Sequence, residues 1–261
     1  MLPIDLKDKV AIVTGSTQGI GLGIARMLAK AGCHVAGCGI SSEGSEKAKN
    51  FKSVVEVSGC KAFYQSIDVK KEADILQFVQ AIKAFFGKID ILISNAGKNM
   101  FTAPENCSID FWTDDNHLNL RSHWLMSKAC HADLKANKGF ILFMTSNHAY
   151  STLTDCFPYN VSKAGIVGMV KALAIQWGPE IRIVGMAPGF IQTEGADDWF
   201  GSFPDPEAKR QEVLSIHPTR NFGNVDEIGA FCAFLASPFA NFITGTTYLI
   251  DGGRSALMQD V

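Results

Sequence analysis

Residues 10–21 read Val-Ala-Ile-Val-Thr-Gly-Ser-Thr-Gln-Gly-Ile-Gly, and this stretch decides the fold class. The β-branched run Val10–Thr14 predicts a buried strand, and apolar residues recur at helical spacing directly after the stretch. In the turn between strand and helix, Gly15 permits a tight bend and Gly19 lets the backbone approach a ligand closely. Gly21 lets the helix pack close to the sheet. We therefore expect a strand–turn–helix unit whose amide groups and helix dipole can hold a pyrophosphate.

The same alternation of short apolar runs and longer amphipathic stretches continues along the chain. It predicts an α/β fold with a Rossmann-type, doubly wound parallel sheet of about seven strands and helices on both faces. In such a sheet, ligands collect at the carboxyl ends of the strands. The expected strands are Val10–Thr14, His34–Cys38, Ala62–Ile67, Ile89–Ser94, Gly139–Thr145, Ile181–Ala187 and Thr246–Ile250. The expected helices are Gly19–Ala31, Ser45–Val57, Lys71–Phe86, Phe111–Leu118, Leu120–Ala136, Tyr159–Trp177 and Asp226–Ala236, the last capped by Asp226.

Composition narrows the class of protein. The 261 residues are 47% hydrophobic and carry a formal net charge of −2 without a block of like charge, which argues against nucleic-acid or membrane-surface partners. The seven cysteines are scattered and form no C-x-x-C pair, which is typical of reduced thiols in a cytoplasmic protein and argues against a metal site. We see no secretory signal, membrane span or linker, so we expect a single domain over residues 1–261.

A tyrosine and a lysine can form a proton-transfer pair on one predicted helix. Tyr159 and Lys163 stand at i and i+4 and so share a helix face. We expect the neighbouring ammonium to lower the pKa of the Tyr159 phenol toward working pH, so that the phenol can exchange a proton with a substrate oxygen. Ser146 ends the preceding buried strand, where its hydroxyl could polarise that oxygen. The alternative is a surface Tyr/Lys pair on an amphipathic helix.

Further motifs follow the glycine-rich turn in a fixed order: Asp68-Val69, Asn95-Ala96-Gly97, Asn119, Ser146, Tyr159-x-x-x-Lys163 and Pro188-Gly189. Jointly they resemble the short-chain dehydrogenase/reductase family over about residues 10–253. The resemblance implies an NAD(P)-dependent enzyme that transfers a hydride between the cofactor and a carbonyl/alcohol pair without a metal. Ser94 and Val184 depart from the family pattern, which often has asparagine at both places.

The resemblance also implies which residues act. The catalytic set would be Ser146, Tyr159, Lys163 and Asn119, with Asn119 anchoring a water relay that reaches Lys163. The cofactor would be held by the turn residues Gly15, Thr17, Gln18, Gly19, Ile20 and Gly21, by Asp68 and Val69 at the adenine, by Asn95, Ala96 and Gly97 near the ribose, by Tyr159 and Lys163 at the nicotinamide ribose, and by Pro188, Gly189, Ile191 and Thr193 on the nicotinamide side.

The sequence leaves the choice between NADP and NAD open. Gly39 stands at the end of the second strand, where an acidic residue would bind the ribose 2′-hydroxyl and select NAD. Ser41 and Ser42 could donate to a 2′-phosphate, whereas Glu43 and Glu46 would repel one. The missing acid slightly favours NADP.

The substrate region is less defined. The resemblance implies a segment near residues 190–217 that closes over the substrate, and a homo-oligomer, either a tetramer or a dimer. Asn147, His148, Asn99 and Trp199 are the candidate substrate contacts, although His148 fits an exposed loop and Trp199 a packing role equally well. Their polarity favours a small polar substrate such as a sugar or hydroxy acid. The alternatives are a 3-oxoacyl reductase acting on a carrier-bound chain and a non-catalytic nicotinamide-binding redox sensor.

Overall fold

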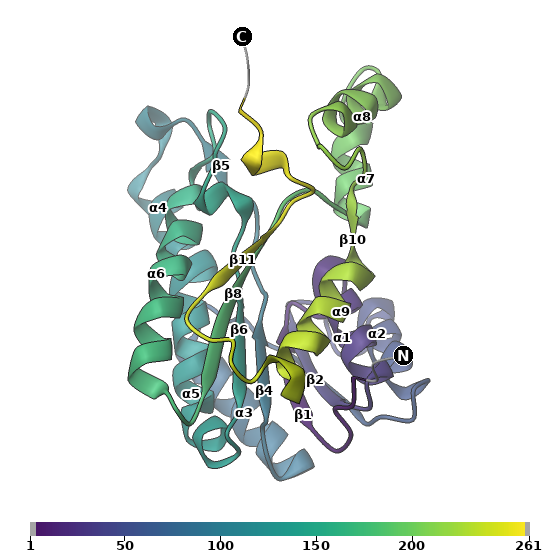
Figure 1. The fold of residues 1–261 in the computed structure, drawn as a ribbon, viewed down its shortest axis with the longest axis vertical. Coiled ribbons are helices and arrows are strands. Elements are labelled where there is room, and N and C mark those ends of the chain that lie inside the picture. Colours follow the sequence, from purple (N-terminus) through teal and green to yellow (C-terminus); the bar gives the residue numbers. More distant parts are fainter. Residues whose placement is uncertain (1–3, 259–261) are drawn as a thin grey trace.

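Seven strands pair in parallel to form one central sheet in the computed structural model, which describes residues 4–258 (Figure 1). Their order across the sheet is β11-β8-β6-β4-β1-β2-β3, so the chain winds outward in both directions from the neighbouring strands β1 and β4. All seven expected strands form, which confirms the predicted doubly wound sheet. The strands are β1 Val10–Thr14, β2 His34–Gly39, β3 Ala62–Ser66, β4 Ile91–Ser94, β6 Phe140–Met144, β8 Arg182–Pro188 and β11 Thr247–Ile250.

Helices cover both faces of this sheet (Figure 1). One face packs against α1 Gly19–Lys30, α2 Glu46–Glu56 and α9 Val225–Ala236, and the other against α3 Glu72–Phe86, α5 Ser122–Ala136 and α6 Tyr159–Trp177. Every residue of β1, β4 and β6 is buried, because these central strands are covered on both sides. That double burial explains why they read as continuous apolar runs in the sequence.

The helical region before α6 differs from the expectation. Two separate helices were expected to meet near residue 119, but α4 Ile109–Asn116 continues through a π-helical turn at His117–Arg121 directly into α5. A π turn shifts the phase of the helix without ending it, and such turns are frequent at functional sites. Asn119 lies inside this turn.

A second correction concerns the start of α9. Asn224, rather than the expected Asp226, caps this helix. The Asn224 side chain accepts from the amide groups of Asp226 and Glu227 at 2.9 and 3.0 Å. The Glu227 carboxylate accepts in return from the Asn224 amide at 2.9 Å, which completes a capping box.

The segment after β8 is helical and stands above the carboxyl edge of the sheet (Figure 1). It holds α7 Glu194–Gly201 and α8 Pro206–Ser215. Two short pairs of strands lie near the same edge: β9 Ile191–Gln192 pairs with β10 Gly223–Asn224, and β5 Phe101–Thr102 pairs with β7 Phe157–Pro158. None of these short strands was expected, since two residues are too few to produce a periodic pattern.

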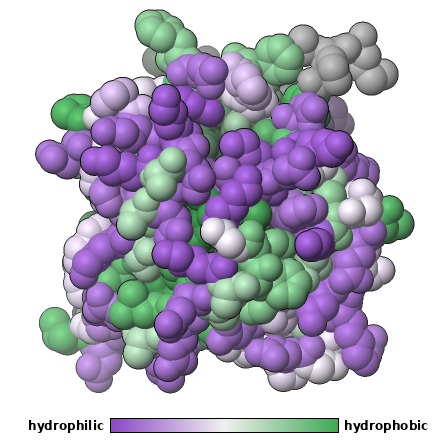
Figure 2. Space-filling model, turned by 90° about the horizontal axis from the view of Figure 1, so that it is seen from below, coloured by the Kyte–Doolittle hydropathy of each residue, from purple (hydrophilic) through white to green (hydrophobic). Residues whose placement is uncertain are grey.

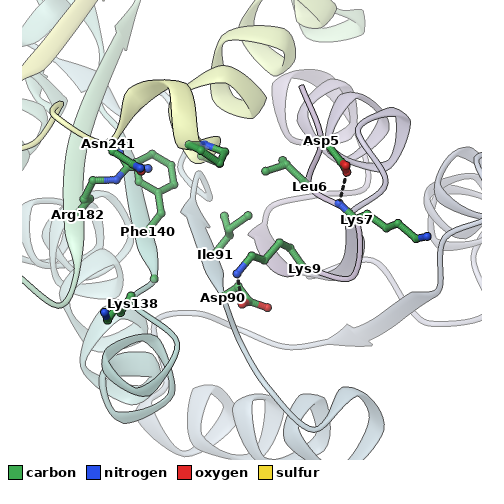
Figure 3. Close-up of a pocket in the computed structure, with 13 residues that line it drawn as sticks. Asp5, Leu6, Lys7, Lys9, Asp90, Ile91, Lys138, Phe140, Arg182 and Asn241 are labelled. Carbon is green, nitrogen blue, oxygen red and sulfur yellow. Dashed lines mark hydrogen bonds and ion pairs between the residues drawn. The ribbon is translucent and has the colours of Figure 1, made fainter. Parts of the chain in front are cut away.

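The opposite edge, where the strands begin, carries a cavity of about 280 Å³ (Figure 3). Asp90 lies buried there and pairs with Lys9 at 2.9 Å and Lys88 at 3.2 Å. Figure 2 views this end of the molecule, where purple hydrophilic side chains surround smaller green hydrophobic areas. Because ligands of parallel sheets collect at the other edge, we assign this cavity a structural role. Within residues 4–258, no helix is long and apolar enough to cross a membrane.

Candidate active site

The glycine-rich turn links β1 to α1 at the carboxyl edge of the sheet. Gly15 and Gly19 have φ angles of +66° and +53°, in the region that favours glycine. A Cβ atom at Gly21 would lie 2.1 Å from the Gly15 carbonyl oxygen, so only glycine lets α1 begin this close to the turn. No side chain in the described part of the chain caps α1, and its first turn has no acidic residue. The helix start therefore suits an anion such as the expected pyrophosphate.

Asn95 ties the end of β4 to this turn. Its backbone amide and that of Ala96 both donate to Thr14 Oγ1 at 2.9 Å. Its side-chain Nδ2 donates to the Thr14 carbonyl oxygen at 2.9 Å. These bonds link β1 to β4, the two strands at which the strand order reverses. In a doubly wound sheet, the ligand crevice lies at this point.

Tyr159 and Ser146 come together beyond the carboxyl end of β6. Tyr159 begins α6, and Ser146 begins a short turn that follows β6. The Ser146 hydroxyl accepts from the His148 amide at 3.2 Å and donates to Asn147 Oδ1 at 3.4 Å, and it is close enough to the Tyr159 phenol to lower the pKa of that group. The Tyr159 ring meets the rings of Phe101 and His148 edge-on, with centroids 5.3 and 6.0 Å away. These contacts fix the position of the phenol.

The expectation that Lys163 lowers the pKa of Tyr159 is wrong. Burial raises the pKa of Tyr159 to about 12, and the nearby Ser146 hydroxyl offsets this only in part. Lys163 Nζ lies 5.5 Å from the centroid of the Tyr159 ring and donates to the Met144 carbonyl oxygen at 3.2 Å. Desolvation of the buried phenol therefore dominates its pKa.

Lys163 and Asn119 meet at Gly97. A Cβ atom at Gly97 would lie 2.8 Å from Asn119 Oδ1 and 3.3 Å from Lys163 Nζ, so glycine leaves room for both polar groups. Burial lowers the pKa of Lys163 to about 8, which allows its amine to hold or release a proton near neutral pH. The structure thus brings the four expected catalytic residues, Ser146, Tyr159, Lys163 and Asn119, to one edge of the sheet.

Comparisons with known proteins identify the family of the chain. A family model described as "Enoyl-(Acyl carrier protein) reductase" matches residues 15–255. The chain belongs to the short-chain dehydrogenase/reductase family. It is 32% identical over 255 residues to dehydrogenase/reductase SDR family member 4 of Sus scrofa, covering 96% of this chain and 88% of that protein. It is 34% identical over 253 residues to D-threitol dehydrogenase of Mycolicibacterium smegmatis, covering 95% and 93%. The ligand-free aldohexose dehydrogenase of Thermoplasma acidophilum superposes with a TM-score of 0.88 at 28% identity, covering 98% and 97%.

This short-chain dehydrogenase/reductase carries two buried ionisable residues that the sequence analysis missed. Asp115 and His123 flank Asn119 at four-residue spacing, and all three side chains are fully buried. His123 Nδ1 shares a hydrogen bond of 2.8 Å with Ser94 Oγ. That bond gives a role to Ser94, which departs from the family pattern. The spacing of 115, 119 and 123 was the signal in the sequence that could have revealed this polar face.

The other expected cofactor residues of this dehydrogenase/reductase line the same edge. At the end where the adenosine is expected, Thr17 Oγ1 and Ser41 Oγ lie 3.4 Å apart. The Ser42 carbonyl oxygen accepts from Ser45 Oγ at 2.6 Å, and Ser45 is the residue that caps α2. Asp68 Oδ1 accepts from the Lys70 amide at 3.0 Å. The remaining expected residues are Gln18, which is exposed before α1, Ile20, which packs against the core, and Val69, which is buried.

The turn after β8 lies beside the glycine-rich turn. Pro188 ends β8, and a Cβ atom at Gly189 would lie 2.5 Å from the Asp251 Cβ, so glycine is required where β8 passes β11. Ile191 is buried in β9. Thr193 caps α7 through a hydrogen bond of 3.2 Å from the Ala196 amide. Its Cγ2 would be 3.5 Å from a Cβ at Gly19, so Thr193 faces the glycine-rich turn.

The candidate substrate residues do not all line one cavity. Asn147 and His148, which follow Ser146 in the chain, line a cavity of about 330 Å³. Asn99 is exposed and does not line it. Trp199 is 41% exposed and packs against Phe190, Phe200 and Phe203 on the α7 side. The cavity is lined by Asn147, His148, Ser151, Thr152, Leu153, Arg254, Ser255 and Leu257. Among residues 4–258, no three His, Cys, Asp or Glu side chains are grouped to hold a metal ion.

Proposed function

We propose that this enzyme transfers a hydride between a nicotinamide cofactor and a small hydroxylated or carbonyl substrate at the carboxyl edge of the sheet. The observation that carries the proposal is the convergence of Ser146, Tyr159 and Lys163 beside an uncapped, glycine-rich helix start. The similarity to D-threitol dehydrogenase supports a small polar substrate.

A nicotinamide cofactor, held by the glycine-rich turn and by Tyr159 and Lys163, would supply or accept the hydride. In the direction of reduction the Tyr159 hydroxyl gives its proton to the substrate oxygen, and in the direction of oxidation it takes the proton back. The Ser146 hydroxyl donates a hydrogen bond to the same oxygen and stabilises its developing charge. Lys163 provides a nearby amine whose pKa of about 8 suits proton return to the buried phenol.

The proposal is tested by mixing the protein with NADPH or NADH and a panel of small carbonyl compounds, and by following loss of nicotinamide absorbance. We expect turnover with at least one member of the panel. Tight binding of cofactor without turnover across the panel would instead support the redox-sensor alternative.

We further propose a preference for NADP over NAD. Gly39 offers no carboxylate to the ribose 2′-hydroxyl, and the Glu43 carboxylate turns aside to accept from the Ser66 amide at 3.4 Å. Lys47 Nζ donates to Gln18 Oε1 at the adenosine end of the turn, where its ammonium can reach a 2′-phosphate. The position of Lys47 therefore adds support for a preference for NADP.

Replacing Lys47 by alanine is therefore expected to lower kcat/KM for NADPH about tenfold while leaving that for NADH nearly unchanged, because only NADPH offers a phosphate to the ammonium. Steady-state kinetics with both cofactors measures the ratio. Lys49→Ala is the matched control, since Lys49 lies on the same helix and pairs with Glu46. Equal losses with both cofactors in Lys47→Ala would contradict the preference.

Within the small polar substrates, we propose a hydroxy acid or the corresponding oxo acid. Arg254, Asn147 and His148 line the same cavity, which adjoins the turn after Ser146. Arginine binds a carboxylate through a planar pair of N–H groups, which a neutral polyol cannot match. An acid end held at Arg254 would leave the neighbouring hydroxyl or carbonyl group toward Ser146.

The test compares acid and neutral partners of equal carbon number, such as glycerate and glycerol. We expect the acid to have the higher kcat/KM, and Arg254→Gln to lower that value about 100-fold without a matching loss for the neutral partner. Arg220→Gln serves as control, because Arg220 bonds to the Ser215 carbonyl oxygen and does not line the cavity. A wild-type preference for the polyol would favour the sugar alternative.

We also propose that the chain acts as a homo-oligomer in the cytoplasm. Trp124 on α5 and Ile175 on α6 expose 42% and 84% of their surface, and Phe242 beside β11 is fully exposed, which supports burial against a second copy. All seven cysteines are free thiols, which supports a reducing compartment. A monomer in analytical ultracentrifugation would contradict the assembly, and a disulfide found by thiol titration of freshly isolated protein would contradict the compartment.

A further inference from the structure

We propose that Asp115 is a positioning residue of the active site: it orients the amide of Asn119 and holds a negative charge beside Lys163. The inference rests on the proposed function, because it concerns how the proton-transferring residues are prepared. Asp115 touches neither Tyr159 nor the cavity that Asn147 and His148 line, so it acts through its neighbours.

The carboxylate of Asp115 lies just before the π-helical turn that follows α4. Asp115 lies one turn before Asn119, at the end of α4, and its side chain is completely buried. Oδ1 accepts from Asn119 Nδ2 at 2.7 Å, and Oδ2 accepts from Ser162 Oγ at 2.5 Å. Since Ser162 directly precedes Lys163 on α6, Asp115 links the π-helical turn to the helix that carries the lysine.

The bond with Asp115 and two bonds with the Lys98 backbone together fix which way the Asn119 amide faces. A carboxylate only accepts hydrogen bonds, so it selects the Nδ2 end of the amide. Nδ2 then also donates to the Lys98 carbonyl oxygen at 2.9 Å, while Oδ1 accepts from the Lys98 amide at 3.0 Å. Oδ1 therefore lies at Gly97, where Lys163 Nζ also lies. Asn119 Oδ1, the acceptor that the expected water relay needs, is therefore held on the same side as Lys163 Nζ.

The same carboxylate sets the charge around the amine. Asp115 raises the pKa of Lys163 against the lowering by burial, and it also raises the pKa of Tyr159. Three other charged or titratable groups belong to this cluster. Asp114 raises the pKa of Asp115, and Cys156 raises the pKa of Tyr159. The pKa of His123 is lowered by burial and by Lys163. Asp115 is the buried anion among them.

Burying a carboxylate is costly unless its oxygens and its charge are compensated. Burial indeed raises the pKa of Asp115, while its two hydrogen bonds and Lys163 act in the opposite direction. An apolar residue at this position would satisfy packing alone without that cost. The carboxylate, its two donors and the nearby amine therefore indicate a role in the chemistry of the site.

The decisive experiment measures the pKa of Lys163 in the folded protein by NMR of 13Cε-labelled lysine, with the signal assigned by its loss in Lys163→Met. In Asp115→Asn, which keeps the size of the side chain and removes its charge, we expect this pKa to fall about 1 unit below its value of about 8. Asp114→Asn is the matched control: it removes the same charge from the neighbouring position, where half of the side chain is exposed. Its effect should stay below about 0.3 unit because solvent screens it.

A second readout uses activity. Loss of the anion lowers the pKa of both Lys163 and Tyr159, so the pH profile of kcat/KM should move about 1 unit toward acid in Asp115→Asn and stay in place in Asp114→Asn. Asp115→Ser, also neutral, should give the same direction if the asparagine variant does not fold. An unchanged Lys163 pKa in the folded neutral variants would overturn the inference. The NMR result does not depend on turnover. An inactive wild type would therefore count against the proposed function, whereas the pKa of Lys163 would still test the role of Asp115.

Discussion

The variant Tyr159→Phe is expected to lose between about 100-fold and 10,000-fold of kcat while it still binds cofactor. The phenylalanine ring keeps the edge-on contacts with Phe101 and His148, so the site retains its shape. Only the hydroxyl that exchanges a proton with the substrate is removed. Steady-state kinetics gives the loss of turnover, and quenching of protein fluorescence by NADPH gives the affinity for cofactor.

The control for this variant is Tyr150→Phe. Tyr150 lies in the turn after Ser146 and is 49% exposed, so its hydroxyl is accessible to water and its removal should change kcat less than twofold, within about 0.4 kcal/mol. Near-normal turnover in Tyr159→Phe would show that another group moves the proton. Loss of cofactor binding along with activity would show that the phenol is needed for binding rather than for proton transfer.

Replacing Gly19 by valine is expected to weaken cofactor binding at least about 100-fold. Gly19 has a φ of +53°, where a β-branched residue is strained. Its Cβ would point toward Thr193 at 3.5 Å, so the added side chain would fill the space between the glycine-rich turn and α7. Calorimetric titration with NADPH measures the loss directly.

Gly59→Val is the matched control for the backbone strain. Gly59 has a φ of +75°, and no heavy atom lies within 4 Å of its Cβ position, so valine there meets strain without crowding. This variant should lower thermal stability and leave cofactor affinity unchanged. If Gly19→Val keeps wild-type affinity, or if both variants lose it equally, the turn does not hold the pyrophosphate.

Much of the fold could be predicted because its buried strands and long helices repeat strongly. The bounds of β1 and α6 agree with the prediction at both ends, since a β-branched run ends at a glycine and a tyrosine begins an uninterrupted helix. The π turn at His117–Arg121 could not be predicted, because it preserves helical periodicity on both sides and only shifts its phase. The helices α7 and α8 were missed because α7 is only eight residues long and contains two glycines, and because α8 has too few apolar residues to mark a buried face.

The candidate site was predictable where a motif names its residues, and less so where burial decides the chemistry. The sequence placed Tyr159 and Lys163 on one helix face, but the direction of the Tyr159 pKa depends on how deeply the phenol lies in the structure. Asp115 and His123 share a helix face with Asn119 by their spacing in the sequence, but the structure is needed to show that this face is buried.

The central claim is that a substrate held beside Ser146 and Tyr159 gains the hydride at its carbonyl carbon and the proton at its carbonyl oxygen. It is tested most directly by reducing a carbonyl substrate with nicotinamide cofactor that carries deuterium at the transferable C4 position, and by locating the label with NMR. We predict one deuterium on the former carbonyl carbon of the alcohol made by the wild type, and labelled alcohol formed at least about 100-fold more slowly by cofactor-saturated Tyr159→Phe. Alcohol formed without deuterium at that carbon, or labelled alcohol formed at equal rates by both proteins, would contradict the mechanism.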